Sequence, residues 1–541
     1  MDKKILSKIV LELYNTKYYN QLDFVKNLRK KFSQYSLAPT PKANLISVYR
    51  QLVKNKKISA KPKFEELLKK RAIRTLSGVS VITVLTKPFP CPGTCIYCPG
   101  EPGMPKSYLS NEPAAQRAKR NLFDPIRQMS MRIQALINNG HQVDKLEVLV
   151  LGGTWSAYED KYQKSFVRDL FYAANTFELA KSGKAKQKKK RQKYPLAKEQ
   201  KINENAKYKI IGLTLETRPD FINEKEIKKL RQLGCTRVQI GVQHTDNKIL
   251  DLIRRGHSIE DSIKATKMLK EVGLKVDQHY MPDLPGSTPA KDLQMFKYVY
   301  SSPDLQPDQI KIYPCVVNEY APLYKWFKAG KYKPFSPKQL INLLLKVKQI
   351  TPPWIRINRL IRDIPNESII AGNKTTNLRQ LLQQELKKQG KVCQCLRCRE
   401  VRNDNQEIAK AILVKREYLA SDGQEIFLSF ESKDYKKCYA FLRLRFNEDK
   451  NKNIFAELKN ASLVRELHVY GQMIPVYNEN SAGETGQSQH LGLGKKLMLE
   501  AEKISRQARY KKIAVISGIG VRNYYRKLGY RLEGTYMTKK L

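Results

Sequence analysis

The sequence predicts an α/β protein: a full or partial (β/α) barrel with a helical region before it and a mixed α/β unit after it. Three observations support this class. Between residues 79 and 315, short apolar runs alternate with amphipathic stretches, as in parallel strands joined by right-handed crossovers. Polar or glycine-rich residues follow these runs, at the strand ends where a barrel gathers its chemistry. Beyond residue 405, further strand-like runs surround one glycine-marked helix start.

Composition sets limits on cofactors, partners and location. The 541 residues include 101 Lys and Arg against 51 Asp and Glu, a net charge of +50, which makes nucleic acid the leading partner. A lysine-rich composition inherited from an AT-rich genome is the alternative. The polar start predicts no signal peptide, and no apolar run approaches the ~20 residues of a membrane helix. A cytoplasmic protein without membrane contact is therefore expected, and its nine cysteines indicate metal binding rather than disulfides.

Residues 1–75 are predicted to form a basic helical region. Apolar residues recur at helical spacing on both sides of a break at Ala38–Pro41; they are Ile5, Ile9 and Leu13, then Leu45, Val48 and Leu52. Contact with RNA and a solvated cap on the next domain are both consistent with this pattern.

Residues 76–350 are predicted to form the barrel. Six strands are expected, at 79–85, 146–151, 210–215, 238–242, 276–280 and 309–313. Five strand ends carry polar or glycine-rich groups: the loop 90–100, Gly152–Thr154, Glu216–Asp220 with Arg218, Gln243–His244 and Met281–Gly286. Five such ends in phase indicate one site, to which Gly152, Gly153, Glu216 and Arg218 contribute cofactor contacts. A basic insert at 181–207 is predicted to be a disordered surface loop.

The loop after the first strand carries Cys91, Cys95 and Cys98, spaced Cys-x3-Cys-x2-Cys. Structural zinc takes four ligands, whereas an iron–sulfur cube held by three cysteines keeps one iron free. Half of a zinc site completed from elsewhere is the alternative.

Residues 351–405 are predicted to be a zinc-binding linker. Cys393, Cys395 and Cys398 form a Cys-x-Cys-x2-Cys cluster that would staple two domains. The fourth ligand is left open between Cys315, Cys438 and the histidines, and free surface cysteines are the alternative. Arg356, Arg359 and Arg362 form either a phosphate-contacting stripe or an interdomain salt-bridge face.

Residues 406–541 are predicted to be mixed α/β. Strands are expected at 425–430, 439–445, 463–470 and 513–516, and Gln489–Gly494 precedes a helix beginning at Lys495. A Gln-x-x-Gly-x-Gly turn before a helix cradles phosphate, because Gly492 and Gly494 let the backbone approach and the helix start offers unpaired N–H groups.

These motifs resemble known families. The cysteine loop, with Tyr97 before its last cysteine, resembles the radical S-adenosylmethionine (SAM) superfamily, and the glycine turn with residues 521–530 resembles the GNAT acetyltransferase fold. The combination resembles the catalytic subunit of Elongator, the tRNA uridine(34) acetyltransferases, over about Arg74 to Leu541. The matching segments are 74–78, 148–154, 216–220, 281–285, 465–471 and 516–525.

The resemblance implies formation of a 5-carboxymethyl-type group at C5 of the tRNA wobble uridine, with acetyl-CoA as carbon donor and SAM as radical source. It implies a [4Fe-4S] cluster on Cys91, Cys95 and Cys98, and catalytic roles for Lys145 and Tyr524. The implied acetyl-CoA contacts are Lys145, Glu466, Leu467, His468, Val469, Gln489, Gly492, Leu493, Gly494, Lys495, Lys496 and Tyr524. Without the resemblance, Lys145 is an ordinary solvated lysine.

Two other functions are open. A protein lysine acetyltransferase would use the GNAT half alone, and a tRNA-binding module would carry a merely structural cluster. The sequence also leaves open a homodimer or association with Elongator-like subunits.

Overall fold

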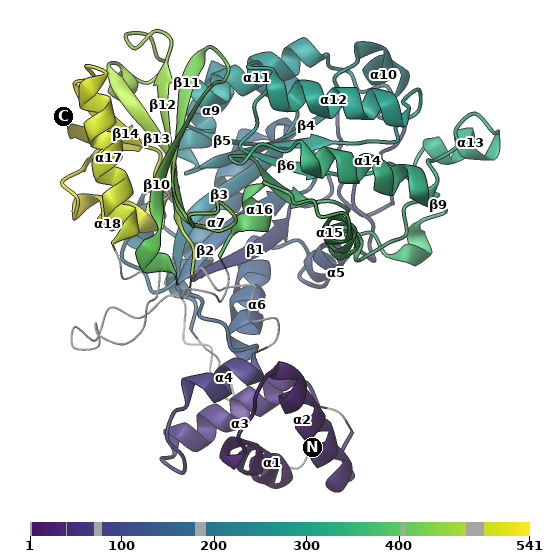
Figure 1. Cartoon of the computed structure of the whole chain (residues 1–541), viewed down its shortest axis with the longest axis vertical. Coiled ribbons are helices and arrows are strands. Elements are labelled where there is room, and N and C mark those ends of the chain that lie inside the picture. Colours follow the sequence, from purple (N-terminus) through teal and green to yellow (C-terminus); the bar gives the residue numbers. More distant parts are fainter. Residues whose placement is uncertain (1–2, 39, 70–77, 179–190, 402–406, 472–491) are drawn as a thin grey trace.

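The computed structural model describes residues 3–38, 40–69, 78–178, 191–401, 407–471 and 492–541. They form a helical N-terminal group, a parallel seven-stranded sheet and a mixed seven-stranded sheet (Figure 1). The predicted α/β class, with a partial barrel followed by a mixed α/β unit, is confirmed. Within these ranges, no helix combines the length and apolar character that crossing a membrane requires.

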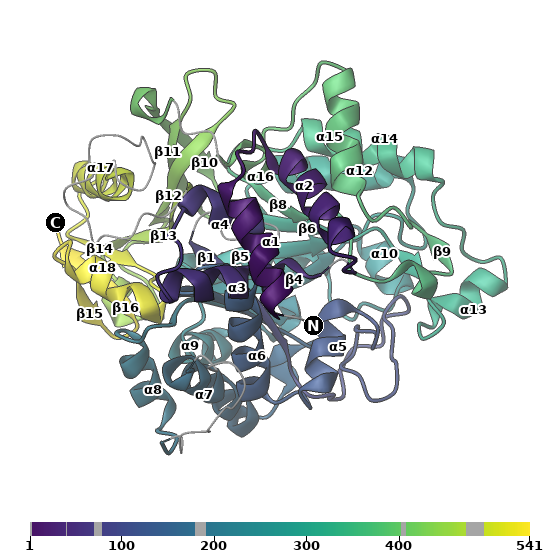
Figure 2. The same ribbon diagram turned by 90° about the horizontal axis from the view of Figure 1, so that it is seen from below.

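The N-terminal group has its own core. Its four helices are α1 (Lys3–Asn15), α2 (Gln21–Gln34), α3 (Lys42–Lys54) and α4 (Pro62–Leu68). Their apolar faces meet around Phe24 and Phe64, whose rings contact edge-to-face with centroids 6.1 Å apart. Figures 1 and 2 place the group at one end of the molecule, where Arg50 Nη1 donates to the carbonyl of Ile137 in α6 (Pro125–Asn138) at 3.1 Å.

The parallel sheet contains all six predicted strands and a seventh. Its order is β1-β2-β3-β4-β5-β6-β8. The strands are β1 (Val79–Leu85), β2 (Lys145–Leu151), β3 (Lys209–Thr217), β4 (Arg237–Gln243), β5 (Lys275–Tyr280), β6 (Gln309–Ile312) and β8 (Arg356–Arg359). β8 lies beyond residue 350, so the sheet continues into the segment predicted as linker. Only four residues long and largely polar, β8 lacks the apolar run by which the other strands were recognised.

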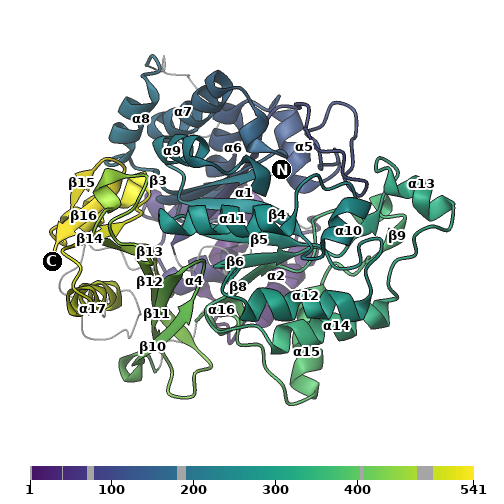
Figure 3. The same ribbon diagram turned by 90° about the horizontal axis from the view of Figure 1, so that it is seen from above.

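The two faces of this sheet differ. Along β2, Leu146, Val148 and Val150 are buried against the helices of the outer face, whereas Glu147 points to the inner face. Figure 3 shows helices around the outer side. The helices of this part of the chain are α6 and the following: α5 (Pro113–Arg120), α7 (Asp160–Thr176), α8 (Leu196–Asn203), α9 (Glu224–Gln232), α10 (Asn247–Leu252), α11 (Ile259–Glu271), α12 (Pro289–Ser301), α13 (Leu323–Lys328), α14 (Pro337–Gln349), α15 (Leu378–Lys388) and α16 (Leu396–Arg399). The short strands β7 (Val316–Val317) and β9 (Ala371–Gly372) pair beside them.

The basic insert is partly ordered. Residues 179–190 lie outside the described residues, but the prediction of disorder is wrong for the part that includes α8. Arg191 pairs with the buried Glu199 through two contacts, Nη1–Oε1 at 2.6 Å and Nη2–Oε2 at 2.7 Å. The basic composition of the segment suggested disorder. It gives no sign of the ion pair that orders the segment, because that pair joins residues eight positions apart.

The second sheet has the order β10-β11-β12-β13-β14-β16-β15. β13 and β14 are parallel, and the other neighbours are antiparallel. The strands are β10 (Ile412–Leu419), β11 (Gly423–Glu431), β12 (Cys438–Asn447), β13 (Ala461–Val469), β14 (Lys512–Val515), β15 (Arg531–Glu533) and β16 (Tyr536–Lys540), with helices α17 (Leu493–Gln507) and α18 (Arg522–Arg526). Three of these strands, β10, β15 and β16, were not predicted.

The second sheet lies across the amino ends of the barrel strands. A fully buried ion cluster joins the two: Arg465 of β13 contacts Asp308 (Nη1–Oδ1, 2.9 Å) and Glu425 (Nη1–Oε1, 2.7 Å). Lys270 adds a second cation, 3.6 Å from Asp308 and 3.5 Å from Glu425. Removing one member would leave a buried charge without its counterion, which is costly. The cluster therefore helps to hold the two sheets in their relative position.

Candidate functional site

The cysteine loop, residues 90–100, leaves β1 at the carboxyl edge of the parallel sheet. Its backbone is fixed from two directions. Ile96 N–H donates to the carbonyl of Ile253, and Gly100 N–H donates to that of Tyr320, both at 3.0 Å. Because these partners come from loops after other strands, the cysteine loop follows one defined course over the strand ends.

The three sulfur atoms of this loop face different neighbours. Cys91 Sγ lies 3.5 Å from Thr154 Oγ1, and Arg255 Nη1 donates to Cys95 Sγ at 3.5 Å. Burial, followed by the nearby Cys95 thiol, raises the pKa of Cys98 to about 12, so a metal centre would have to displace its proton. Three cysteines that face separate neighbours suit a cube of iron and sulfur, in which each thiolate binds a different iron.

Two arginines beside the loop keep buried nitrogen atoms without a partner among the described residues. Arg218 holds Asp220 through Nε and Nη2, at 2.9 and 3.0 Å, while its Nη1 is unpartnered. A Cβ on Gly93 would collide with this Nη1, which therefore points at the cysteine loop. Arg255 Nε is also unpartnered. Spare buried guanidinium donors suit a carboxylate, such as the one that the methionine part of SAM carries.

Glu216, near the end of β3, lies in the same region. It accepts a hydrogen bond from Tyr108 Oη at 3.0 Å, and its Oε1 lies 3.7 Å from His279 Nδ1. Burial holds the pKa of His279 well below its ordinary value, so the imidazole is neutral. Sequence reasoning missed Tyr108 and His279, although His279 alternates with Asp277 along β5 as an inward-facing polar position does.

Gly152 and Gly153 follow β2 with positive φ angles of 139° and 94°. A Cβ at Gly152 would collide with Thr86 Oγ1, and one at Gly153 would lie 3.4 Å from the carbonyl oxygen of Lys106. These contacts explain glycine here by backbone shape and close packing. Their predicted contact with a cofactor stays a prediction.

Lys145 lies at the opposite edge of the sheet from the cysteine loop. It is the first residue of β2 and is in register with Val79, so the length of β1, about 20 Å at ~3.3 Å per residue, separates it from that loop. The same edge carries Lys275, whose Nζ lies 3.4 Å from Glu466 Oε1 in β13. Lys145 therefore lies at the edge of the barrel where Lys275 contacts the second sheet.

A polar column fills the inner face of the sheet between these two edges. Its contacts run from Glu147 through Arg237, Gln309, Asn358, Asp277 and Gln239 to Lys311. At its far end, burial lowers the pKa of Lys311 to about 8, and Lys311 Nζ donates to Gln239 Oε1 at 2.6 Å. None of these residues was singled out from the sequence.

Four of the predicted acetyl-CoA residues, Leu467, Val469, Gly494 and Tyr524, come together at the start of α17. A Cβ on Gly494 would lie 3.0 Å from Tyr524 Oη, 3.5 Å from Val469 Cγ2 and 3.9 Å from Leu467 Cδ2. Gly492 precedes the helix with a left-handed φ of 64° and open space around it. Leu493 is buried, whereas Lys495 and Lys496 are exposed. Gln489 lies outside the described residues.

β13 and β14 diverge beside this helix start. Their register ends at Val464 and Val515, whereas β13 continues to Val469. The predicted residues Glu466–Val469 therefore lie on the part of β13 that has left its parallel neighbour. A gap between diverging strands beside a helix N-terminus can admit an extended chain ending in phosphate.

Glu466 and His468 occupy the barrel side of β13. Burial opposes ionisation of Glu466, but Lys275 and Arg443 outweigh it and lower the pKa of Glu466 to about 2. Arg443 Nε donates to Glu466 Oε2 at 3.0 Å. Burial lowers the pKa of His468 to about 4, so this histidine is neutral.

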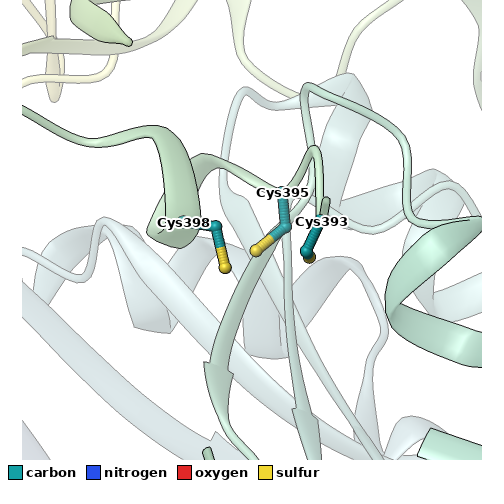
Figure 4. Close-up of side chains that lie close together, drawn as sticks. All are labelled: Cys393, Cys395 and Cys398. Atoms are coloured by element: carbon teal, nitrogen blue, oxygen red, sulfur yellow. The ribbon is translucent and has the colours of Figure 1, made fainter. Parts of the chain in front are cut away.

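A second group of three cysteines has a different geometry. The sulfur atoms of Cys393, Cys395 and Cys398 all lie within 4.8 Å of one another and converge on one point (Figure 4). Hydrogen bonds from Cys393 and Cys395 lower the pKa of Cys398, and Lys348 Nζ lies 3.6 Å from its sulfur. Three converging thiols fit a single soft or borderline ion such as Zn²⁺.

Neither named cysteine candidate for a fourth ligand belongs to that group among the described residues. Cys438 Sγ donates to Ala440 O and packs with Phe427, while Cys315 packs with Ile249. Cys438 is close along the backbone, pairing with Glu400, but its sulfur points into the apolar core.

Two of the three arginines of the predicted stripe form internal contacts. Arg356 contacts Glu400 at 2.7 Å and Tyr470 Oη at 2.9 Å. Arg362 contacts Glu112 at 3.1 Å. Arg356 and Arg362 therefore have internal partners, whereas Arg359 is exposed and, among the described residues, pairs only with its neighbour Asp363, at 2.6 Å, so the phosphate alternative stays open for Arg359.

The half-barrel sheet and its three-cysteine loop define a radical SAM protein. The Radical SAM superfamily matches residues 90–299, and the Radical SAM C-terminal domain matches residues 307–388. Membership of this superfamily implies a [4Fe-4S] cluster and SAM.

Longer matches give the particular family. The chain is 43% identical over 492 residues to a tRNA uridine(34) acetyltransferase of Methanocaldococcus infernus, covering 88% of each protein. It is 37% identical to human Elongator complex protein 3, covering 96% of this chain and 93% of that one. A solved structure of the M. infernus Elp3 with an N-terminal deletion superposes with a TM-score of 0.72 at 40% identity, covering 86% of this chain and all of that one. The chain belongs to the family of these tRNA uridine(34) acetyltransferases and Elongator proteins.

Proposed function

We propose that this protein modifies C5 of the wobble uridine of tRNA, forming a 5-carboxymethyl-type group with acetyl-CoA as carbon donor. The observation that carries the proposal is the union, in one chain, of a radical SAM cysteine loop with a diverging strand pair beside a glycine-marked helix. The similarity to a tRNA uridine(34) acetyltransferase supports uridine 34 of tRNA as the target.

The carboxyl edge is proposed to supply the radical. When bound, the cluster and SAM would supply the radical chemistry that activates the acetyl methyl group for bonding to C5. The chain's own part is to hold and shelter them. Cys91, Cys95 and Cys98 hold the cluster, while the unpartnered nitrogens of Arg218 and Arg255 meet the SAM carboxylate.

The amino edge is proposed to hold acetyl-CoA within a GNAT-type unit. The N–H groups after Gly492 and Gly494 would face the pyrophosphate, with Lys495 and Lys496 exposed beside it. The extended arm would follow β13 past its divergence from β14, toward Tyr524 and Lys145. A column of polar contacts runs through the barrel interior from Glu147 to Lys311, between this edge and the carboxyl edge, and it supports a shared interior for both ends of the reaction.

The remaining finer assignments extend this proposal. Zinc on Cys393, Cys395 and Cys398 would fasten the segment 351–405, which supplies β8 to the barrel sheet, to the GNAT unit. The other proposed parts are 1–75, 76–350 and 406–541. The net charge of +50 supports tRNA as the macromolecular partner. A cytoplasmic location follows from that substrate, and self-association or Elongator-like subunits would add to the complex.

The deciding experiment incubates anaerobically reconstituted protein with tRNA, acetyl-CoA, SAM and a reductant, then identifies the nucleosides by mass spectrometry. Gly494→Glu should weaken acetyl-CoA binding by about 100-fold, because bulk and a like charge would meet the pyrophosphate at the helix start. The matched control is Lys503→Gln, which changes the net charge equally at an exposed position of α17. Acetyl-CoA affinity is measured by calorimetry and tRNA binding by gel shift. Unchanged acetyl-CoA affinity in Gly494→Glu would remove the support for the coenzyme site.

A further inference from the structure

His468 stands on the side of β13 that faces the barrel. Side chains alternate along a strand, and Leu467 and Val469 pack against the core beneath α17. Glu466 and His468 therefore point the other way, toward the amino ends of the barrel strands. His468 thus borders both the proposed acetyl-CoA strand and the barrel interior.

The imidazole ring is held in a fixed orientation. It stacks on Phe441, with ring centroids 5.7 Å apart and ring planes at 18° to each other. The centroid of the Tyr470 ring lies 4.4 Å from that of His468. Its Nε2 is buried and has no hydrogen-bond partner among the described residues. A buried ring nitrogen without a partner is costly unless a ligand or water completes it.

Charged groups surround the ring and fix its protonation. Glu466 of its own strand, Glu147 of β2, Lys275 of β5 and Arg356 of β8 all face it. Burial dominates these charges and lowers the pKa of His468 to about 4. The ring is therefore neutral near pH 7 and can accept a proton.

We propose that His468 is the general base that releases CoA from the modified uridine. This inference rests on the proposed function, because joining the acetyl carbon to C5 would leave the new group bound to CoA as a thioester. His468 Nε2 takes a proton from water as the water oxygen bonds to the thioester carbonyl carbon. The carbon–sulfur bond then breaks, and the imidazolium returns the proton to the departing sulfur. The products are the carboxymethyl group and the CoA thiol, with no oxidant or reductant consumed.

Glu466, the other candidate base on this side of β13, is less suited to the task. Each of its carboxylate oxygens contacts a cation, Arg443 at 3.0 Å and Lys275 at 3.4 Å, whereas His468 Nε2 has no partner among the described residues. The cations that restrain Glu466 would instead favour the negative oxygen that develops on the carbonyl.

The test uses His468→Asn in the full reaction. Formation of 5′-deoxyadenosine should stay within about twofold of wild type, whereas carboxymethyluridine should fall by about 100-fold, in the range that general bases contribute. A tRNA conjugate that still carries CoA should accumulate, detectable by its mass. Calorimetry with an acetyl-CoA analogue bearing a methylene between sulfur and carbonyl should show a loss of affinity far smaller than the loss of product, which separates catalysis from coenzyme binding.

The matched control is His257→Gln. His257 is another buried histidine whose pKa burial lowers to about 4, but its Nε2 lies 3.0 Å from Gly241 O in the barrel. Wild type and His257→Gln should hydrolyse the isolated conjugate without SAM, whereas His468→Asn should not. Loss of product without accumulation of the conjugate, or product formation at the wild-type rate, would overturn the role of His468. If wild type itself formed neither 5′-deoxyadenosine nor product, the proposed function would fail first and take this inference with it.

The pH profile gives a second readout that a structural role would not produce. Because His468 is neutral well above pH 4, hydrolysis of the isolated conjugate by wild type should be flat from pH 5.5 to pH 8. Residual hydrolysis in His468→Asn should rise about tenfold per pH unit, as attack by hydroxide requires. A wild-type rate that climbed tenfold per unit over the same range would exclude His468 as the base.

Discussion

The two groups of three cysteines contrast in how they present their sulfur atoms. In the loop 90–100, Cys91 faces a threonine hydroxyl and Cys95 faces an arginine. In the linker, Cys393, Cys395 and Cys398 face one another within 4.8 Å. The two groups of three thiols therefore lie in different electrostatic environments.

The difference teaches that chain spacing alone does not choose a metal. The loop's course is set from outside by backbone hydrogen bonds to Ile253 and Tyr320, which leave its sulfurs turned to separate neighbours. In the linker, a one-residue gap and the start of α16 turn all three sulfurs to one point. A cluster that shares its charge over several irons suits the first arrangement, and a single ion suits the second.

Among changes to the two cysteine groups, Cys95→Ser should have the largest effect on activity. Loss of a cluster ligand should remove bound iron and lower 5′-deoxyadenosine formation by at least about 1,000-fold, because nothing remains to deliver the electron that cleaves SAM. Iron and zinc are measured together by elemental analysis. Zinc should stay at the wild-type level, and a parallel loss of both metals would mean that the two groups are not independent.

The reciprocal change, Cys395→Ser, should remove about one zinc per chain and leave the iron in place. Because metal binding energy is folding energy, thermal unfolding should begin several degrees lower, and a chelator should lower wild-type stability in the same way. Wild-type protein that contains no zinc when prepared without chelator would contradict the linker assignment.

Much of the fold was accessible from the sequence, because apolar runs mark strands that are buried on the outer face. β1 to β6 differ from their predicted bounds by at most two residues. β8 and β10 escaped for a physical reason: one is four residues long and largely polar, and the other alternates half-buried and exposed positions throughout. Their pairing partners, not their composition, make them strands.

The site could be predicted where its residues lie close together in the sequence, and not where it depends on contacts between distant strands. The cysteine loop and the helix start at Gly492 can be recognised from the spacing of their cysteines and glycines. Arg255 donates to Cys95 across 160 positions of the chain, and no local pattern signals that contact.

A smaller effect should follow from Arg255→Gln. The guanidinium beside Cys95 Sγ stabilises negative charge on the thiolate and on the reduced cluster, so its loss should make the cluster harder to reduce. We expect iron to be retained, with 5′-deoxyadenosine formation about 10–100-fold slower and a more negative midpoint potential by spectroscopic titration. Arg254→Gln, one residue earlier and exposed, removes the same charge and should change neither. Equal effects of the two variants would mean that only overall charge matters.

The smallest effect concerns Lys348, which lies 3.6 Å from Cys398 Sγ and is fully buried. Zinc held by three thiolates carries a net negative charge, and the Lys348 ammonium offsets that charge where water is absent. Lys348→Gln should therefore weaken zinc binding by about tenfold, at the lower end of what outer-shell changes cost. The affinity is measured by competition with a chromophoric chelator. Lys346→Gln, two residues away on α14 and exposed, is the matched control and should bind zinc as wild type does. Tighter zinc binding in Lys348→Gln would show instead that the ammonium repels the ion, and that the site is completed by a ligand that neutralises the three thiolates in its place.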